Sequence, residues 1–211
     1  MDASNLNREI GGSQKAVDDE ELKVEIVRSL ILKIRPDADV LAIPRRWQDD
    51  PAPLRTSHLI FGCLDTFAER REIEVLCRRC LIPYIDIGMD VHPTEGQPPR
   101  MAGQVALSMP GGPCLWCFRV ITKENLAREA ANYGNAGPRP QVVWPNGILA
   151  STAVGIAVNL LTDWTKSLRG PAYYSYDGNL GTLTPHVWLK YPERCTHYSL
   201  EDVGDSIFRP V

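Results

Sequence analysis

The chain has 211 residues, of which 44% are apolar and 23% are charged, values that suit a globular domain with a real core. Its net charge of −3 argues against a nucleic-acid partner, because such binders usually present a basic face. No uninterrupted apolar run approaches the ~18 residues of a membrane span, and the polar N-terminus lacks the apolar core of a secretory signal. We therefore expect no membrane association and a cytoplasmic location, with cysteines that are reduced, metal-bound or catalytic rather than disulfide-bonded.

The first fifty residues predict one helix. Residues 1–19 are mostly polar and are expected to form a loop. A helix from about Glu20 to Ile34, capped by Asp18 or Asp19, has apolar residues on one face and ends before Pro36. Residues 39–43 are a short strand candidate.

A strand–helix–strand unit follows. The apolar run 58–64 predicts a buried strand, and Thr66 with Glu69 three positions later forms a capping box that starts a helix to about Cys80. Residues 83–89 predict the next strand. This order and spacing indicate a βαβ unit with parallel strands and a right-handed crossover.

The second half predicts further elements of a sheet with covering helices. We expect a strand over 103–109, a weak helix over 122–132 that stops near Gly134, and a proline-rich loop over 137–147. A long apolar helix is expected over 147–168, then a hairpin over 173–184 with its turn at Asp177-Gly178 or Asn179. The fold class is therefore α/β, a mainly parallel sheet flanked by helices with a C-terminal hairpin.

Asp65 is a candidate ligand for a metal ion. It falls between a predicted strand and the helix that begins at Thr66, and open α/β sheets bind ligands beyond the carboxyl ends of their strands. A carboxylate there can hold Mg²⁺ on a nucleotide. Alternatively, Asp65 supports the helix N-terminus electrostatically, and spacing alone does not separate the two.

The pair Cys114-x-x-Cys117, in a turn after a strand, is typical of a zinc site. Two more ligands would close a tetrahedron, and Cys195 and His197 are the candidates, so that zinc would clasp the tail to the sheet. A redox role is an alternative for Cys114 and Cys117. A second pair with the same spacing, at positions 77 and 80, falls in a predicted helix and is expected to pack in the core.

Basic residues early in the chain carry little signal by themselves. Arg8 and Lys23 would ordinarily be solvated surface residues. No Walker motif, GxGxxG or HExxH is present in the sequence, so the usual phosphate-binding loops are absent from it.

Taken in order, six short motifs resemble the ThiF/MoeB/ubiquitin-activating enzyme superfamily over roughly residues 2–168. They are Ser4-Asn5-Leu6-Asn7-Arg8, Leu22-Lys23-Val24, Cys63-Leu64-Asp65-Thr66 with Arg70 after it, Gly103-Gln104-Val105, Pro113-Cys114-x-x-Cys117 and Gly147-Ile148-Leu149-Ala150. The resemblance implies a Rossmann-like fold in a single adenylation domain over 1–211. Residues 1–100 would form a partial nucleotide-binding half, and residues 101–211 a carrier-binding half with the zinc clasp and tail.

The resemblance also implies an activity. A ubiquitin-like or sulfur-carrier protein would offer its C-terminal glycine carboxylate to the α-phosphate of ATP with Mg²⁺, giving an acyl-adenylate and pyrophosphate. By matching positions, Asn5 and Arg8 would contact the nucleotide, Lys23 would neutralise phosphate charge and Asp65 would hold Mg²⁺. Arg70 would brace Asp65. Members of the superfamily form homo- or heterodimers, so a dimer is expected.

Two departures from the family pattern qualify this expectation. Family members begin with a strand, a glycine-rich turn and a helix, a block of roughly 40 residues that has no counterpart here, so we expect an N-terminally truncated fold or one completed by another chain. The segment 140–146 also lacks the cysteine that would carry a thioester. Two alternative functions are a catalytically inactive or incomplete partner subunit of a heteromeric activating enzyme, and a zinc-stapled structural module.

Overall fold

We describe a computed structural model of the chain, in which residues 1–131, 142–162, 164–165, 172–187, 195–199 and 203–204 are described. The chain forms two compact units, Met1–Pro51 and Ala52–Val211. Each unit is described by itself.

The N-terminal unit consists of short helices. They are η1 (Ala3–Asn5), α1 (Gln14–Asp18), α2 (Lys23–Ile34) and η2 (Trp47–Asp49). The expected helix is present as α2, but it begins after Leu22, which makes no side-chain cap. Asp18 and Asp19 do not cap it; they end α1, whose own cap is the Ser13 hydroxyl accepting from the Ala16 N–H. Residues 39–43 form no strand, since no other strand occurs in this unit to pair with them.

The C-terminal unit holds a five-stranded sheet in the order β1-β2-β3-β4-β5. Its elements are α3 (Ala52–Arg55), β1 (Ile60–Gly62), α4 (Phe67–Arg79), β2 (Tyr84–Thr94), β3 (Gln97–Ser108), α5 (Lys123–Ala131), α6 (Val143–Thr162), β4 (Tyr173–Asp177) and β5 (Thr182–Pro185). The expected α/β class, βαβ unit and C-terminal hairpin are all present.

The strand directions differ in part from expectation. β1 and β2 are parallel, with Ile60 opposite Tyr84, as the βαβ prediction required. The other three pairings are antiparallel, so the expectation of a mainly parallel sheet holds only for β1 and β2 among the described strands. The reason is local: a tight turn containing Gly96, with φ of 69°, joins β2 to β3, and such a turn is too short for a parallel crossover.

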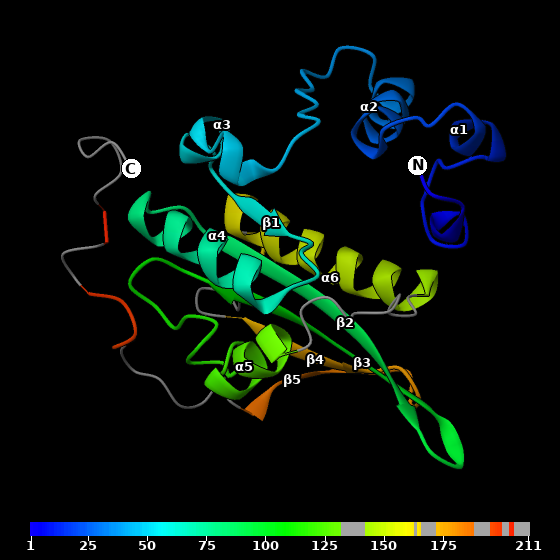
Figure 1. Ribbon diagram of the computed structural model, residues 1–211. Helices are drawn as coiled ribbons and strands as arrows, with labels where there is room; N and C mark the ends of the chain where they lie inside the picture. The colour runs from blue at the N-terminus through cyan, green and yellow to red at the C-terminus, as the bar shows by residue number, and fades with distance from the viewer. Residues whose placement is uncertain (132–141, 163, 166–171, 188–194, 200–202, 205–211) are drawn as a thin grey trace. The chain divides into compact units, whose positions relative to one another are not determined.

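Helices cover the sheet in layers, with α4 and α6 on opposite faces (Figure 1). On β2, Ile85 packs into the core under α6, together with Val105 and Leu107 of β3 and Leu149 of α6. Its neighbour Asp86 points the other way, toward α4, where Arg70 binds it. β2 is therefore buried on both faces, which is typical of a central strand in an α/β domain.

α5 and α6 lie close to their predicted ranges. The expected stop at Gly134 falls outside the described residues. The expected helix end at Leu168 is wrong, since α6 ends at Thr162 and residues 164–165 are not helical. α6 begins at Val143, four residues earlier than expected, and includes Pro145 in its first turn, where a proline removes no helical hydrogen bond.

By length and composition α6 could cross a membrane, with a mean hydropathy of 1.3. Its buried residues, including Leu149, Ala153 and Ile156, pack against the sheet. The core helix of a soluble protein has the same properties, so this single helix is weak evidence for a membrane span.

Two glycines provide a test of how closely α6 packs on the sheet. A Cβ at Gly103 would lie 2.6 Å from Cδ1 of Leu149 and 2.9 Å from the Gly88 carbonyl oxygen, whereas a Cβ at Gly155 would meet nothing within 4 Å. We expect Gly103→Ala to lower the free energy of unfolding by about 1–3 kcal/mol, because the backbone oxygen cannot move aside. Gly155→Ala, the matched control, should raise it by up to about 1 kcal/mol through helix propensity. Urea unfolding of both variants measures the difference, and equal effects would contradict the packing described.

Candidate functional site: a carboxylate at the sheet edge and a Cys/His cluster

Asp65 lies at the carboxyl end of β1, directly before the start of α4. Its side chain is exposed and makes no hydrogen bond to any part of the chain that the structure describes. Thr66 is the N-cap of α4, as predicted: the Glu69 N–H donates to the Thr66 hydroxyl, and this hydroxyl, rather than the Thr66 backbone N–H of a full capping box, donates to the Glu69 carboxylate. Because Thr66 and Glu69 cap the helix, the carboxylate of Asp65 remains available to a ligand.

Arg70 holds the turn that carries Asp65. It donates to the Leu64 carbonyl oxygen at 2.6 Å and to the Asp86 carboxylate at 2.6 Å. Asp86 also accepts from the Tyr84 hydroxyl at 3.0 Å. Burial raises the pKa of Asp86, and the neighbouring Arg70 opposes that shift. Arg70 therefore braces the backbone next to Asp65 rather than the Asp65 side chain.

A second acidic side chain fixes the other side of this turn. The Glu129 carboxylate, from α5, accepts hydrogen bonds from the backbone N–H groups of Phe67 and Ala68 at 3.0 Å each. These are N–H groups of the first turn of α4, which have no partner within the helix. Glu129 thus ties α5 to the start of α4.

The remaining predicted nucleotide ligands lie in the N-terminal unit. Asn5 is buried and accepts a hydrogen bond from Arg8 at 2.8 Å, so the structure brings these two together. Lys23 is exposed and begins α2. The pKa of Asp2 is lowered mainly by hydrogen bonds from Ser4, with a small contribution from Lys23. The roles of Asn5, Arg8 and Lys23 toward a nucleotide remain predictions.

The four predicted metal ligands are gathered in one place. Cys114, Cys117, Cys195 and His197 offer ligand atoms that all lie within 4.8 Å of one another. Cys114 Sγ is 3.6 Å from Cys117 Sγ, and His197 Nδ1 is 3.5 Å from the first sulfur and 3.4 Å from the second. Cys195 and His197, the two tail residues predicted as candidates from the sequence, both lie at the cluster.

This geometry fits a tetrahedral zinc ion. With Zn–S near ~2.3 Å and Zn–N near ~2.1 Å, ligand atoms at the corners of a tetrahedron are about 3.6–3.8 Å apart. The cluster distances that involve Cys114, Cys117 and His197 are close to these values, and Cys195 Sγ lies 3.9 Å from His197 Nδ1. The contact between Cys114 and Cys195 lowers the pKa of Cys195 and raises that of Cys114, as expected where thiols crowd around one point.

Beneath the cluster lies a buried polar network that centres on Glu74 of α4. Glu74 is fully buried and accepts hydrogen bonds from the Leu115 N–H at 2.8 Å, the Ser108 hydroxyl at 2.6 Å and the Tyr198 hydroxyl at 2.7 Å. Leu115 and Tyr198 are the immediate neighbours of Cys114 and His197. One carboxylate therefore holds both halves of the cluster in place.

Arg78 completes the network. It donates to the carbonyl oxygens of Gly112 and Pro113, at 3.0 and 2.7 Å, and to the Ser108 hydroxyl at 2.8 Å. The turn before Cys114 is thus bound to α4 through its backbone.

The roles of Glu74 and Arg78 are not among the sequence-based predictions. A signal was available, because Arg70, Glu74 and Arg78 are spaced four apart and fall on one face of the predicted helix. That face also carries Ile73 and Cys77, which are buried. Charged residues repeated on an otherwise apolar helix face indicate buried, paired groups, since unpaired charges are not buried.

The second pair of closely spaced cysteines, Cys77 and Cys80, is not suited to nucleophilic chemistry. Cys77 is buried in α4, as predicted, and burial raises the pKa of its thiol to about 12. Cys80 caps the end of α4, and burial raises its pKa as well. Neither thiol is suited to act as a nucleophile near neutral pH.

Similar proteins support the fold. E. coli MccB in complex with ATP has a TM-score of 0.66 and 16% identity over 88% of this chain and 53% of that one. The microcin C7 biosynthetic enzyme MccB, in complex with N-formylated MccA, has a TM-score of 0.67 and 16% identity, over 88% of this chain and 54% of that one. PaaA has a TM-score of 0.64 and 15% identity, over 88% of this chain and 61% of that one. The chain thus spans between half and two thirds of these proteins, and no curated protein matches it.

The similarity to these solved structures establishes the fold alone, at identities this low. The family follows from the sequence model named ThiF family, which matches residues 1–195. Because that match spans nearly all of the chain, the protein belongs to the ThiF family, with the adenylyltransferase-type α/β fold of that family.

Proposed function

We propose that this chain is an ATP-dependent adenylation domain that activates the C-terminal carboxylate of a ubiquitin-like or sulfur-carrier protein. The observation that carries the proposal is the exposed carboxylate of Asp65 at the carboxyl end of β1. Its turn is braced by Arg70 and Glu129, and its side chain has no partner among the described residues. A structural aspartate at a helix N-terminus would be expected to accept a hydrogen bond from the helix, and here Thr66 does so instead.

The reaction is a displacement at phosphorus. A carboxylate oxygen of the carrier's last residue attacks the α-phosphate of ATP, the bond from that phosphorus to the bridging oxygen breaks, and pyrophosphate leaves. Asp65 would hold Mg²⁺, which when bound neutralises phosphate charge. Arg8 and Lys23 would offset the charge of the phosphates, and Asn5 would contact the nucleotide. The chain's contribution is positioning and charge stabilisation.

MccB supports this assignment by analogy, because it has been crystallised with ATP and with MccA. We infer that both units of this chain form one such domain and that it works as a homo- or heterodimer in the cytoplasm. The cysteines at positions 77 and 80 are poor nucleophiles, which agrees with an enzyme that forms no thioester on those residues.

Replacement of Asp65 tests the proposal. We expect Asp65→Asn to lower ATP–pyrophosphate exchange about 100-fold or more, since a charged ligand of the Mg²⁺–ATP complex is lost. The assay uses a panel of ubiquitin-like and sulfur-carrier proteins that end in glycine. Asp90→Asn, on β2, is the matched control and should retain exchange.

The alternative roles give different results. If Asp65 only supports α4, Asp65→Asn should lower stability by about 0.5–1 kcal/mol and leave exchange unchanged. If the chain is an inactive partner subunit, calorimetry should detect no Mg²⁺–ATP binding to the wild type, and the proposal would then be wrong.

We also propose that the Cys/His cluster binds one zinc ion as a structural clasp. Metal analysis of the purified protein should find about one zinc per chain. Cys114→Ser should lose it and lower the unfolding midpoint by about 5 °C or more, because the tail and the turn before Cys114 are no longer joined. Cys80→Ser, a control at a cysteine outside the cluster, should keep the metal. Metal-free protein whose midpoint depends on reductant would instead support the redox role of Cys114 and Cys117.

A further inference from the structure

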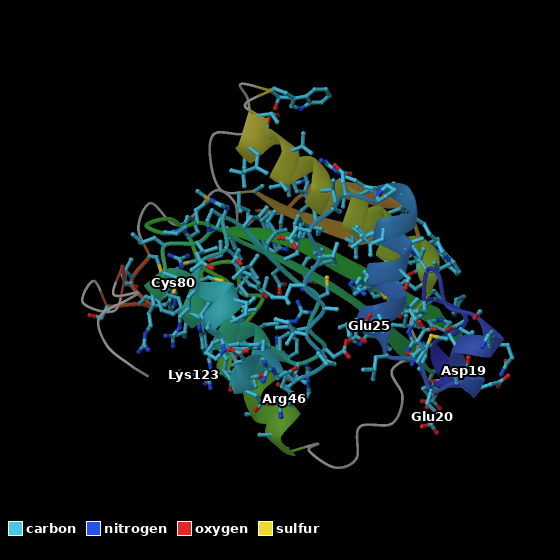
Figure 2. All side chains as sticks on the ribbon, turned by 90° about the horizontal axis from the view of Figure 1, so that it is seen from above. Asp19, Glu20, Glu25, Arg46, Cys80 and Lys123 are labelled. Atoms are coloured by element: carbon cyan, nitrogen blue, oxygen red, sulfur yellow. The ribbon has the colours of Figure 1, made fainter. Side chains whose placement is uncertain are left out.

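A groove of about 1040 Å³ lies between the outer side of α4 and the segment that follows the Cys114 turn. Arg71 and Arg79 line it from α4, Arg119 and Lys123 line it from the opposite side, and Val75 and Trp116 contribute apolar surface. Figure 2 shows Lys123 beside α4. The groove belongs wholly to the C-terminal unit.

The charge of this groove is opposite in sign to that of the whole chain. Five basic side chains line it, those of residues 71, 78, 79, 119 and 123, against one acidic side chain, Glu124. The chain as a whole has a net charge of −3. A concave surface with one sign of charge concentrates counter-charged ligands, so this local excess favours an anionic partner.

Arg78 is the buried member of the basic residues that line the groove. It is 3% exposed, and its hydrogen bonds go to carbonyl and hydroxyl oxygens rather than to a carboxylate. Its Nε is buried and has no hydrogen-bond acceptor among the described residues. The ring of Tyr198 lies 5.4 Å from the guanidinium carbon. The wall of the groove therefore contains a buried guanidinium, which shares Ser108 with the Glu74 carboxylate and is partly offset by its charge.

The groove is separate from the proposed nucleotide site. Asp65 lies before the first turn of α4, whereas Arg79 ends the helix. A helix rises ~1.5 Å per residue, so these two positions are about 20 Å apart along α4. The lining residue nearest to Asp65 along α4 is Arg71, six positions or about 9 Å away, and from there the groove runs away from Asp65 toward Arg79.

The dimensions favour a peptide over a single phosphate. Arg71 and Arg79 are eight helical residues apart, or about 12 Å, and an extended peptide covers that distance in about four residues at ~3.3 Å each. Acidic side chains at alternate positions would reach the basic walls while apolar side chains between them contact Val75 and Trp116.

We propose that this groove binds an acidic, extended peptide segment of the protein whose C-terminus is activated. Only the identity of the protein that contains this peptide segment rests on the proposed function. The groove, its charge and its apolar floor are independent of ATP chemistry, so binding can be measured without nucleotide.

The experiment measures fluorescence anisotropy of a fluorescein-labelled (Glu-Val)4 peptide with the whole chain at low salt. The double variant Arg71→Gln/Lys123→Gln changes two exposed side chains and should weaken binding about tenfold. The control, Arg100→Gln/Arg128→Gln, removes the same charge from exposed positions outside the groove and should leave binding within twofold. Affinity of the wild type should fall as NaCl is raised.

Several outcomes would overturn the proposal. They are absence of binding to the wild type, equal weakening by both double variants, and equal affinity for (Gln-Val)4. Tighter binding of inorganic phosphate or single-stranded DNA, lost in the groove variant, would assign the groove to phosphate groups and contradict the peptide. Asp65→Asn should bind (Glu-Val)4 normally, so a failure of the adenylation assay remains distinct from a failure of this one.

Discussion

The buried carboxylate of Glu74 is the interaction on which the C-terminal half depends. Burying a carboxylate costs several kcal/mol unless its oxygens are satisfied, and three donors satisfy them here, from β3, from the Cys114 turn and from the tail. These donors are far apart in the sequence. The cluster ligands can therefore meet only when α4 has packed on the sheet and presents Glu74 to all three.

α4 connects the chemical features of the C-terminal unit. Arg70, in its second turn, holds the backbone next to Asp65 through Leu64 and Asp86. Glu74 and Arg78, one and two turns later, hold the Cys/His cluster, and the outer side of the helix forms one wall of the basic groove. A change in how α4 packs would thus affect the turn at Asp65 and the Cys/His cluster together.

Much of the local structure was predictable. The N-cap at Thr66, the parallel β1–β2 pair and the C-terminal hairpin depend on spacing and turn chemistry within a few residues of one another. The prediction of a strand over 39–43 was wrong. A strand requires a partner strand, and the apolar pattern of this segment gives no information about whether a partner is present. The antiparallel β2–β3 pairing was not predicted. It depends on a turn at Gly96 and on two strands that continue beyond the apolar runs from which they were predicted.

The sequence by itself indicated the family, the candidate carboxylate Asp65 and the four residues of the Cys/His cluster, because residue type, short spacings and the order of short motifs identify them. Only the tertiary structure decided that Cys114 and His197 meet, 83 positions apart, and that Arg70, Glu74 and Arg78 are buried and bonded. It also decided that basic residues from two separate segments line one groove. The physical reason is that a buried charge is stable only beside its partners, and those partners come from distant segments that a local pattern cannot identify.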